Sequence, residues 1–111
     1  MSETRVYSAA ELYSTLEGTG LPVSFGFFEE EQTPPYLIYI GDGQEQFRAD
    51  NTVYSKENSY QVEYYFTKKD EAAEDALEEA LLAGGFLYEK SADVFDESES
   101  VWVIYYLVWR K

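Results

Sequence analysis

The sequence contains no cysteine and no histidine. It therefore has no thiol nucleophile, disulfide, imidazole base or zinc site built from these ligands. Its longest apolar run, residues 101–109, is too short to cross a bilayer, and we expect no signal peptide because no such pattern opens the chain. It also lacks a phosphate-cradling glycine motif. These absences predict a soluble, non-secreted protein that is not an enzyme and binds no cofactor or metal.

Positive charge is also scarce, with 8 Lys and Arg against 22 Asp and Glu and a net charge of −14. Such a surface repels phosphates and anionic lipid, so direct nucleic-acid or membrane binding is disfavoured. The acids occur in runs such as Glu29–Glu31, which are typical of solvated turns rather than of a glycosidase acid pair. Residues 42–51 offer oxygen ligands for calcium, but their spacing does not match an EF-hand loop and favours a polar turn.

Apolar residues are abundant: 45% of the residues are hydrophobic and 18% are aromatic. At 111 residues we expect one domain, spanning residues 1–111. Capping-box patterns at Ser8–Glu11 and Thr67–Asp70 predict two helices, the first ending at Gly18 and the second running from about Lys68 to Ala83.

Five further segments read as strands. Residues 21–28 are rich in aromatics, and Tyr36–Ile40 precedes a predicted turn at Gly41–Gly43 and a polar hairpin or excursion over 44–58. Tyr60–Phe66 alternates between inward and outward residues, and an acidic turn joins strands over 86–95 and 101–109. This order predicts an α+β fold with a mainly antiparallel or mixed sheet of four to six strands and two helices on one face.

The last strand, Val101–Trp109, has no polar face. One face packs on the core, and the other would expose Trp102, Ile104, Tyr106 and Val108, or else the opposite set that includes Trp109. Because two short helices cover only one side of a sheet, we interpret the exposed set as a subunit interface. The alternative is a central strand covered on both faces within the monomer.

Three segments carry a family resemblance: Pro34-Pro35-Tyr36, Ala49–Lys56 and Tyr64–Asp70. Together with residues 86–90 and 99–105, they resemble small proteins of tailed bacteriophages and prophages over about residues 22–108. The chain looks like a tail-terminator or head–tail joining protein of long-tailed siphophages. The resemblance implies a sheet flanked by two helices and a ring, commonly of six subunits, that caps the tail tube and docks the head.

The resemblance also implies the partners: copies of the chain itself, the tail-tube protein and a head-completion or connector protein. The location would be the virion tail or neck, reached after assembly in the host cytoplasm. The last strand would make subunit contacts. The excursion, with Asp42, Glu45, Arg48 and Asp50, would reach a neighbour or line the channel, where acidic walls keep DNA from sticking.

Two other classes of protein stay open at this point. An acidic DNA-mimic inhibitor of a nucleic-acid-binding host enzyme would carry acids spaced like phosphates on one face. A chaperone for a secreted effector would form a stable two-fold dimer.

Overall fold

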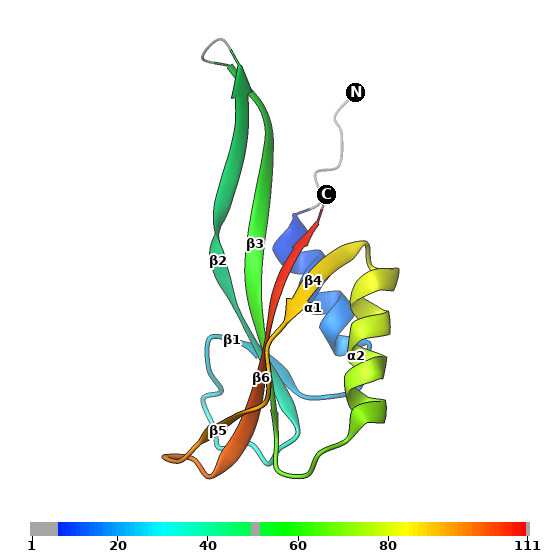
Figure 1. Ribbon diagram of the computed structural model, residues 1–111, viewed down its shortest axis with the longest axis vertical. Helices are drawn as coiled ribbons and strands as arrows, with labels where there is room; N and C mark the ends of the chain where they lie inside the picture. Colours follow the sequence, from blue (N-terminus) through cyan, green and yellow to red (C-terminus); the bar gives the residue numbers. More distant parts are fainter. Residues whose placement is uncertain (1–6, 50–51, 111) are drawn as a thin grey trace.

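The computed structural model describes residues 7–49 and 52–110, which form two helices and a six-stranded sheet (Figure 1). In chain order the elements are α1 (Ser8–Glu17), β1 (Val23–Phe25), β2 (Tyr36–Ala49), β3 (Thr52–Phe66), α2 (Glu71–Ala83), β4 (Phe86–Lys90), β5 (Val94–Asp96) and β6 (Val101–Arg110). The strands lie in the order β1-β2-β3-β6-β4, and β5 also pairs with β6. Only β1 and β2 are parallel, so the predicted α+β class with a mainly antiparallel sheet is confirmed.

The core lies between the helices and one face of the sheet. The alternation predicted for the third strand is confirmed, since these four side chains are buried: Tyr60, Val62, Tyr64 and Phe66. Two leucines from each helix belong to the same buried cluster: Leu12, Leu16, Leu77 and Leu81. Figure 1 shows both helices on the same side of the sheet. This packing stabilises helices that would be marginal alone, because short isolated helices scarcely form in water.

Helix α1 spans the predicted residues, but its predicted capping box is wrong. The N-cap is Tyr7, and no side chain caps the helix. The Ser8 hydroxyl instead lies 2.6 Å from the Tyr60 hydroxyl on β3, and Glu11 forms an ion pair with Arg110 of β6. Both polar side chains therefore attach the helix to the sheet rather than closing its own first turn.

Helix α2 begins three residues later than the pattern predicted. Asp70 is the N-cap, and its carboxylate accepts a hydrogen bond of 3.1 Å from the Ala73 amide. Thr67 and Lys68 therefore lie in the β3–α2 loop, outside the helix. Asp70 is a strong N-cap, because its side-chain oxygen satisfies an otherwise unpaired amide.

The turn predicted at Gly41–Gly43 is wrong, because β2 continues through these residues. Gly41 pairs with Tyr60 and Gly43 with Ser59, so Asp42 is the extra residue of a β-bulge. Gly43 has φ 129°, which side-chain-bearing residues rarely adopt. Strands β2 and β3 form a long hairpin whose far part, residues 42–49 and 52–59, we call the arm; it extends beyond the body of the molecule (Figure 1).

Two other predicted strands are shorter than expected. The segment 21–28 is a strand only over β1, and the segment 86–95 divides into β4 and β5. Between β4 and β5, Ser91 keeps contact with β6: its amide donates to the Tyr105 carbonyl at 2.8 Å, and its hydroxyl accepts from the Tyr105 amide at 2.9 Å. The acidic turn predicted after residue 96 is confirmed.

Candidate functional site

Strand β6 does not present the surface that its sequence favoured. Trp102 is 39% exposed, but Ile104, Tyr106 and Val108 are fully buried, so the expectation that these three lie on an open face is wrong. They belong to the core cluster that includes the leucines of both helices. The helices thus pack against these three side chains, which we had expected on the outer side of the sheet.

Tyr106 shows why this face turned inward. Its hydroxyl donates a 2.7 Å hydrogen bond to the Glu78 carboxylate of α2, so even the polar atom of this side chain has a partner in the core. Burial raises the pKa of the Tyr106 hydroxyl, and the hydrogen bond to Glu78 raises it further. A buried tyrosine normally needs such a partner, and the sequence did not reveal which residue would supply it.

Charged groups around Glu78 form a network between α2 and β4. Lys90 lies 2.8 Å from Glu78 and 3.0 Å from the buried Glu74, which Lys69 also contacts at 2.7 Å. Burial alone would lower the pKa of Lys90, but its hydrogen bonds to both glutamates outweigh this and raise it. For Glu78, hydrogen bonds from Lys90, Tyr106 and Tyr88 outweigh burial and lower the pKa. Every charge in this network is paired, which is typical of a structural cluster rather than of a catalytic site.

The face of the sheet away from the helices is the first candidate interaction surface. We call it the outer face and define it by half-buried residues that lie opposite one another in neighbouring strands: Ile38, Ile40, Gln61, Glu63, Tyr105, Leu107 and Trp109. The second set of β6 side chains considered for exposure, which includes Trp109, lies on this outer face. No helix of the described chain covers this face, so these seven side chains stay partly in contact with solvent, whereas Val103 on the same face is buried.

Glu63 is the one acidic residue of β3 among these apolar neighbours. Its carboxylate accepts hydrogen bonds from Gln61 at 2.8 Å and from the Tyr65 hydroxyl at 2.6 Å. Burial raises the pKa of Tyr65, and the hydrogen bond to Glu63 raises it further. The Glu63 carboxylate is therefore satisfied within the sheet, which leaves the neighbouring apolar side chains of the outer face available to a partner.

A groove of about 400 Å³ lies at one end of the outer face. Its lining includes aromatic and aliphatic side chains, namely Phe27, Phe28, Tyr36, Ile38, Tyr65 and Val101. It also includes four carboxylates from the loop after β1 and from the end of β5 and the turn after it: Glu30, Glu31, Asp96 and Glu99. No lysine or arginine that the structure describes pairs with any of these four. We call this the acidic groove.

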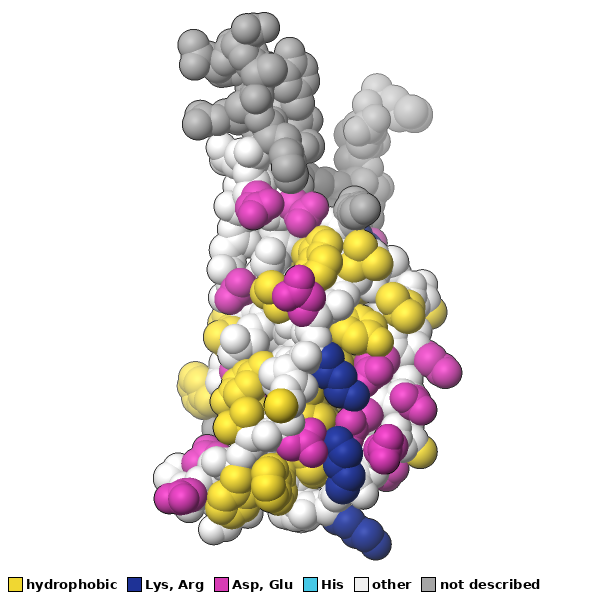
Figure 2. Space-filling model, in the orientation of Figure 1, with side chains coloured by type: hydrophobic (Ala, Val, Ile, Leu, Met, Phe, Trp, Pro, Cys, Tyr) yellow, Lys and Arg dark blue, Asp and Glu magenta, His cyan; other side chains and the backbone are white. Residues whose placement is uncertain are grey.

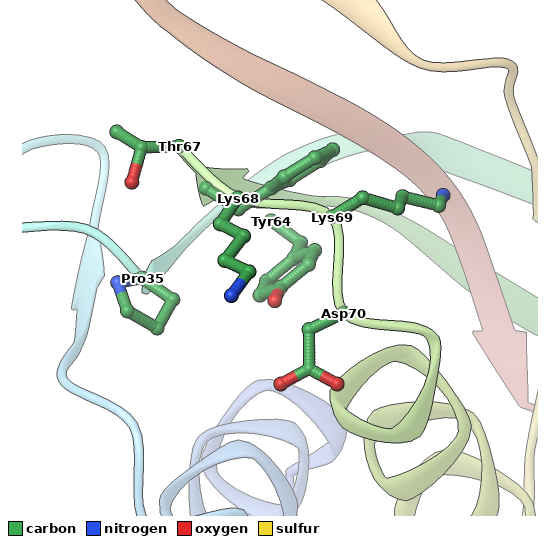
Figure 3. Close-up of a pocket in the computed structure, with 7 residues that line it drawn as sticks. Pro35, Tyr64, Thr67, Lys68, Lys69 and Asp70 are labelled. Carbon is green, nitrogen blue, oxygen red and sulfur yellow. The ribbon is translucent and has the colours of Figure 1, made fainter.

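The opposite side of the same end carries the β3–α2 loop. Figure 2 shows basic side chains at this end beside α2 and acidic ones at the β5–β6 turn. Four cations have side chains that the structure describes. Lys68, exposed in this loop, has no ion pair with any described residue, whereas Lys69, Lys90 and Arg110 are all paired. Figure 3 shows the Lys68 side chain between Pro35 and Asp70, beside a hollow of about 430 Å³.

The predicted loop contacts fall on the arm. Asp42 and Glu45 are exposed on β2, Arg48 pairs with Val53 in the backbone register, and Asp50 lies outside the described residues. Near the base of the arm, Gln44 donates a 2.7 Å hydrogen bond to Asn58 across the hairpin. The arm is therefore part of a long hairpin, which is the first of the two alternatives that the sequence left open for residues 44–58.

Two exposed aromatic clusters lie at opposite edges of the sheet, and of their members sequence reasoning had named only Trp102 as exposed. On the β1 side, Phe25 and Phe27 are 63% and 68% exposed. On the β5 side, Phe95 is 46% exposed, and its ring centroid lies 5.1 Å from that of Trp102. The Phe-Gly-Phe segment around Gly26 was the only available signal for the first cluster. The second depends on β5 pairing with β6.

The described residues contain no group of acidic side chains placed to hold a metal ion. Neither described helix has the length and apolarity needed to cross a membrane. No protein-family model matches the chain, and no curated protein matches it either. The candidate site therefore consists of surfaces: the outer face, the acidic groove, the Lys68 loop and the arm.

Proposed function

We propose that the chain is a structural protein of the phage neck, a tail terminator that assembles into a ring through protein–protein contacts. The observation that carries the proposal is the outer face, an apolar sheet surface that no described helix covers. Contiguous apolar surface on a small domain is typical of a protein interface. The chain's order of helix, hairpin, helix and strands agrees with the layout that the family resemblance implies.

A ring needs two different surfaces on each subunit, because its contacts are head-to-tail. The outer face supplies one of them, and a different surface of the next copy, outside the helical side, supplies the other. The arm, with the exposed Asp42 and Glu45, extends from this body and is free to reach a neighbour or the channel. The aromatic cluster of Phe95 and Trp102 at the β5 edge then remains for the tail-tube or connector protein.

The experiment is a mass measurement by light scattering over a range of protein concentrations, alone and with the tail-tube protein of the same phage. We expect a ring-sized species, alone or on addition of tube protein, and shorter or uniform tubes when the chain is present. A chain that stays monomeric and leaves tube polymerisation unchanged would refute the terminator assignment.

One observation favours the second candidate, an acidic DNA-mimic inhibitor. Glu71, Asp75 and Glu79 are exposed on α2 at intervals of four residues, or about 6 Å of helix rise. However, the row has only three charges, and other exposed acids are scattered over loops, strands and α1, so it supports this candidate less than the outer face supports the first. Salt-sensitive binding to a basic host enzyme, lost on reversing these three charges, would favour the inhibitor.

A further inference from the structure

The acidic groove and the Lys68 loop have complementary chemistry and lie on different sides of the molecule. The groove is lined by aromatic and aliphatic side chains and by four carboxylates without a described cationic partner. The loop carries the one described cation that has no carboxylate partner. The groove thus lacks a described cation, and Lys68 lacks an ion pair with any described carboxylate.

Their positions allow contact between copies but not within one chain. Figure 1 shows the β5–β6 turn and the β3–α2 loop at the same end of the long axis, with the turn on the outer side of the sheet and the loop leading to α2. Two copies placed side by side in the same orientation would therefore bring the loop of one toward the groove of the next. Such a contact is head-to-tail and repeats around a ring.

We infer that the loop Thr67–Lys69 of one copy docks into the acidic groove of the next, with the Lys68 ammonium among the carboxylates of Glu30, Glu31 and Glu99. This inference rests on the self-assembly part of the proposed function and assigns the two surfaces that meet. The aromatic part of the lining, which includes Tyr36 and Tyr65, would contact the aliphatic part of the lysine side chain. The charges fix the register of the contact, since complementary charge sets orientation more than affinity.

The test is a pair of charge-reversal variants studied separately and mixed. The loop variant is Lys68→Glu, and the groove variant is the triple change Glu30→Lys, Glu31→Lys and Glu99→Lys. All four side chains are exposed and have no ion-pair partner among the described residues, so both variants should fold, which circular dichroism and unfolding curves check. A matched control reverses three acids on the outside of α2: Glu71, Asp75 and Glu79.

Self-association is measured by sedimentation velocity over a concentration series in which the unaltered chain associates, with tube protein added if required. Each variant alone juxtaposes like charges, so we expect its association to weaken about tenfold or more. An equal mixture should restore association, because the acidic loop of the first variant meets the basic groove of the second, and the Lys68 loop of the second meets the acidic groove of the first. The control should associate at least as well as the unaltered chain.

The outcomes separate this inference from the proposed function. If both variants associate alone like the unaltered chain, or if their mixture stays apart, the loop–groove contact is refuted while a ring through other surfaces stands. If the mixture associates again but no form of the chain changes tube polymerisation, the contact stands and the terminator role is refuted. A third outcome would favour another basic partner. If the unaltered chain stays monomeric but binds a lysine-rich peptide, and the groove variant does not bind that peptide, the copy-to-copy contact is overturned.

Discussion

The sequence assigned the Tyr106 side chain to an interface, but in the structure it points into the core. Replacing Tyr106 with phenylalanine removes its hydroxyl and tests this inward orientation. The lost hydrogen bond, 2.7 Å long, ends on the charged Glu78. Hydrogen bonds to charged groups contribute about 1.5–3 kcal/mol. Tyr88 and Lys90 still donate to Glu78 in the variant, so we expect the lower end, about 1.5–2 kcal/mol of unfolding free energy. For a domain of this size that corresponds to a melting temperature lower by about 6–8 °C.

The assay is urea unfolding followed by circular dichroism, with Tyr105→Phe as the matched control. Tyr105 is the neighbouring, half-buried residue of the outer face, and its hydroxyl has no hydrogen bond to any described residue. Its loss should cost less than about 0.5 kcal/mol. Equal losses for the two variants, or a greater loss for Tyr105→Phe, would refute the assignment of the inner and outer faces.

Three further predictions follow from the same structure. Arg110→Ala removes the ion pair with Glu11, the hydrogen bond to the Gly84 carbonyl and the contact with the Phe86 ring, and together these losses should lower the unfolding free energy by about 1–2 kcal/mol. Arg110→Lys should lose less, and equal curves for all three forms would contradict the role of these contacts. Because the folded state lowers the pKa of Glu78, its stabilisation is complete above the unfolded pKa, about 4.3, and is lost as pH falls through the folded value. The stability gap between the unaltered chain and Glu78→Gln should therefore shrink from pH 6 to pH 2, and a gap constant over that range would be inconsistent with it. Leu107→Glu should leave a folded chain that no longer assembles, whereas Val108→Glu, at a fully buried position, should fail to fold; a Leu107→Glu variant that assembles normally would count against the outer face as an interface.

Local patterns predicted the elements that depend on nearby residues. The apolar spacing in α1 and α2 placed both helices within about three residues, and the alternation over Tyr60–Phe66 identified the second half of β3, whose first half begins at Thr52. These patterns are reliable because they reflect which side chains one element can bury at once. The class of fold followed from the order of these elements.

Predictions from local patterns failed where a residue far away in the sequence contacted a group that the pattern had paired with a nearby residue. The Ser8–Glu11 capping box is absent because Tyr60 and Arg110 take its two side chains. The Gly41–Gly43 turn is absent because β3 continues to pair with β2 beyond it, and one bulge at Asp42 accommodates the glycines. In both cases the partner lies far away in the sequence, so no local pattern contains it.

The site shows the same division. From the sequence alone it followed that the last strand has two apolar faces, that the chain has excess acid, and that two helices leave one side of a sheet uncovered. Which face of β6 is covered depends on packing against Leu77 and Leu81 and on the hydrogen bond from Tyr106 to Glu78. The acidic groove likewise gathers the loop after β1 and the turn after β5, which lie far apart in the chain. Composition and periodicity determine how much surface must be buried, but only the tertiary structure decides which residues remain outside to meet a partner.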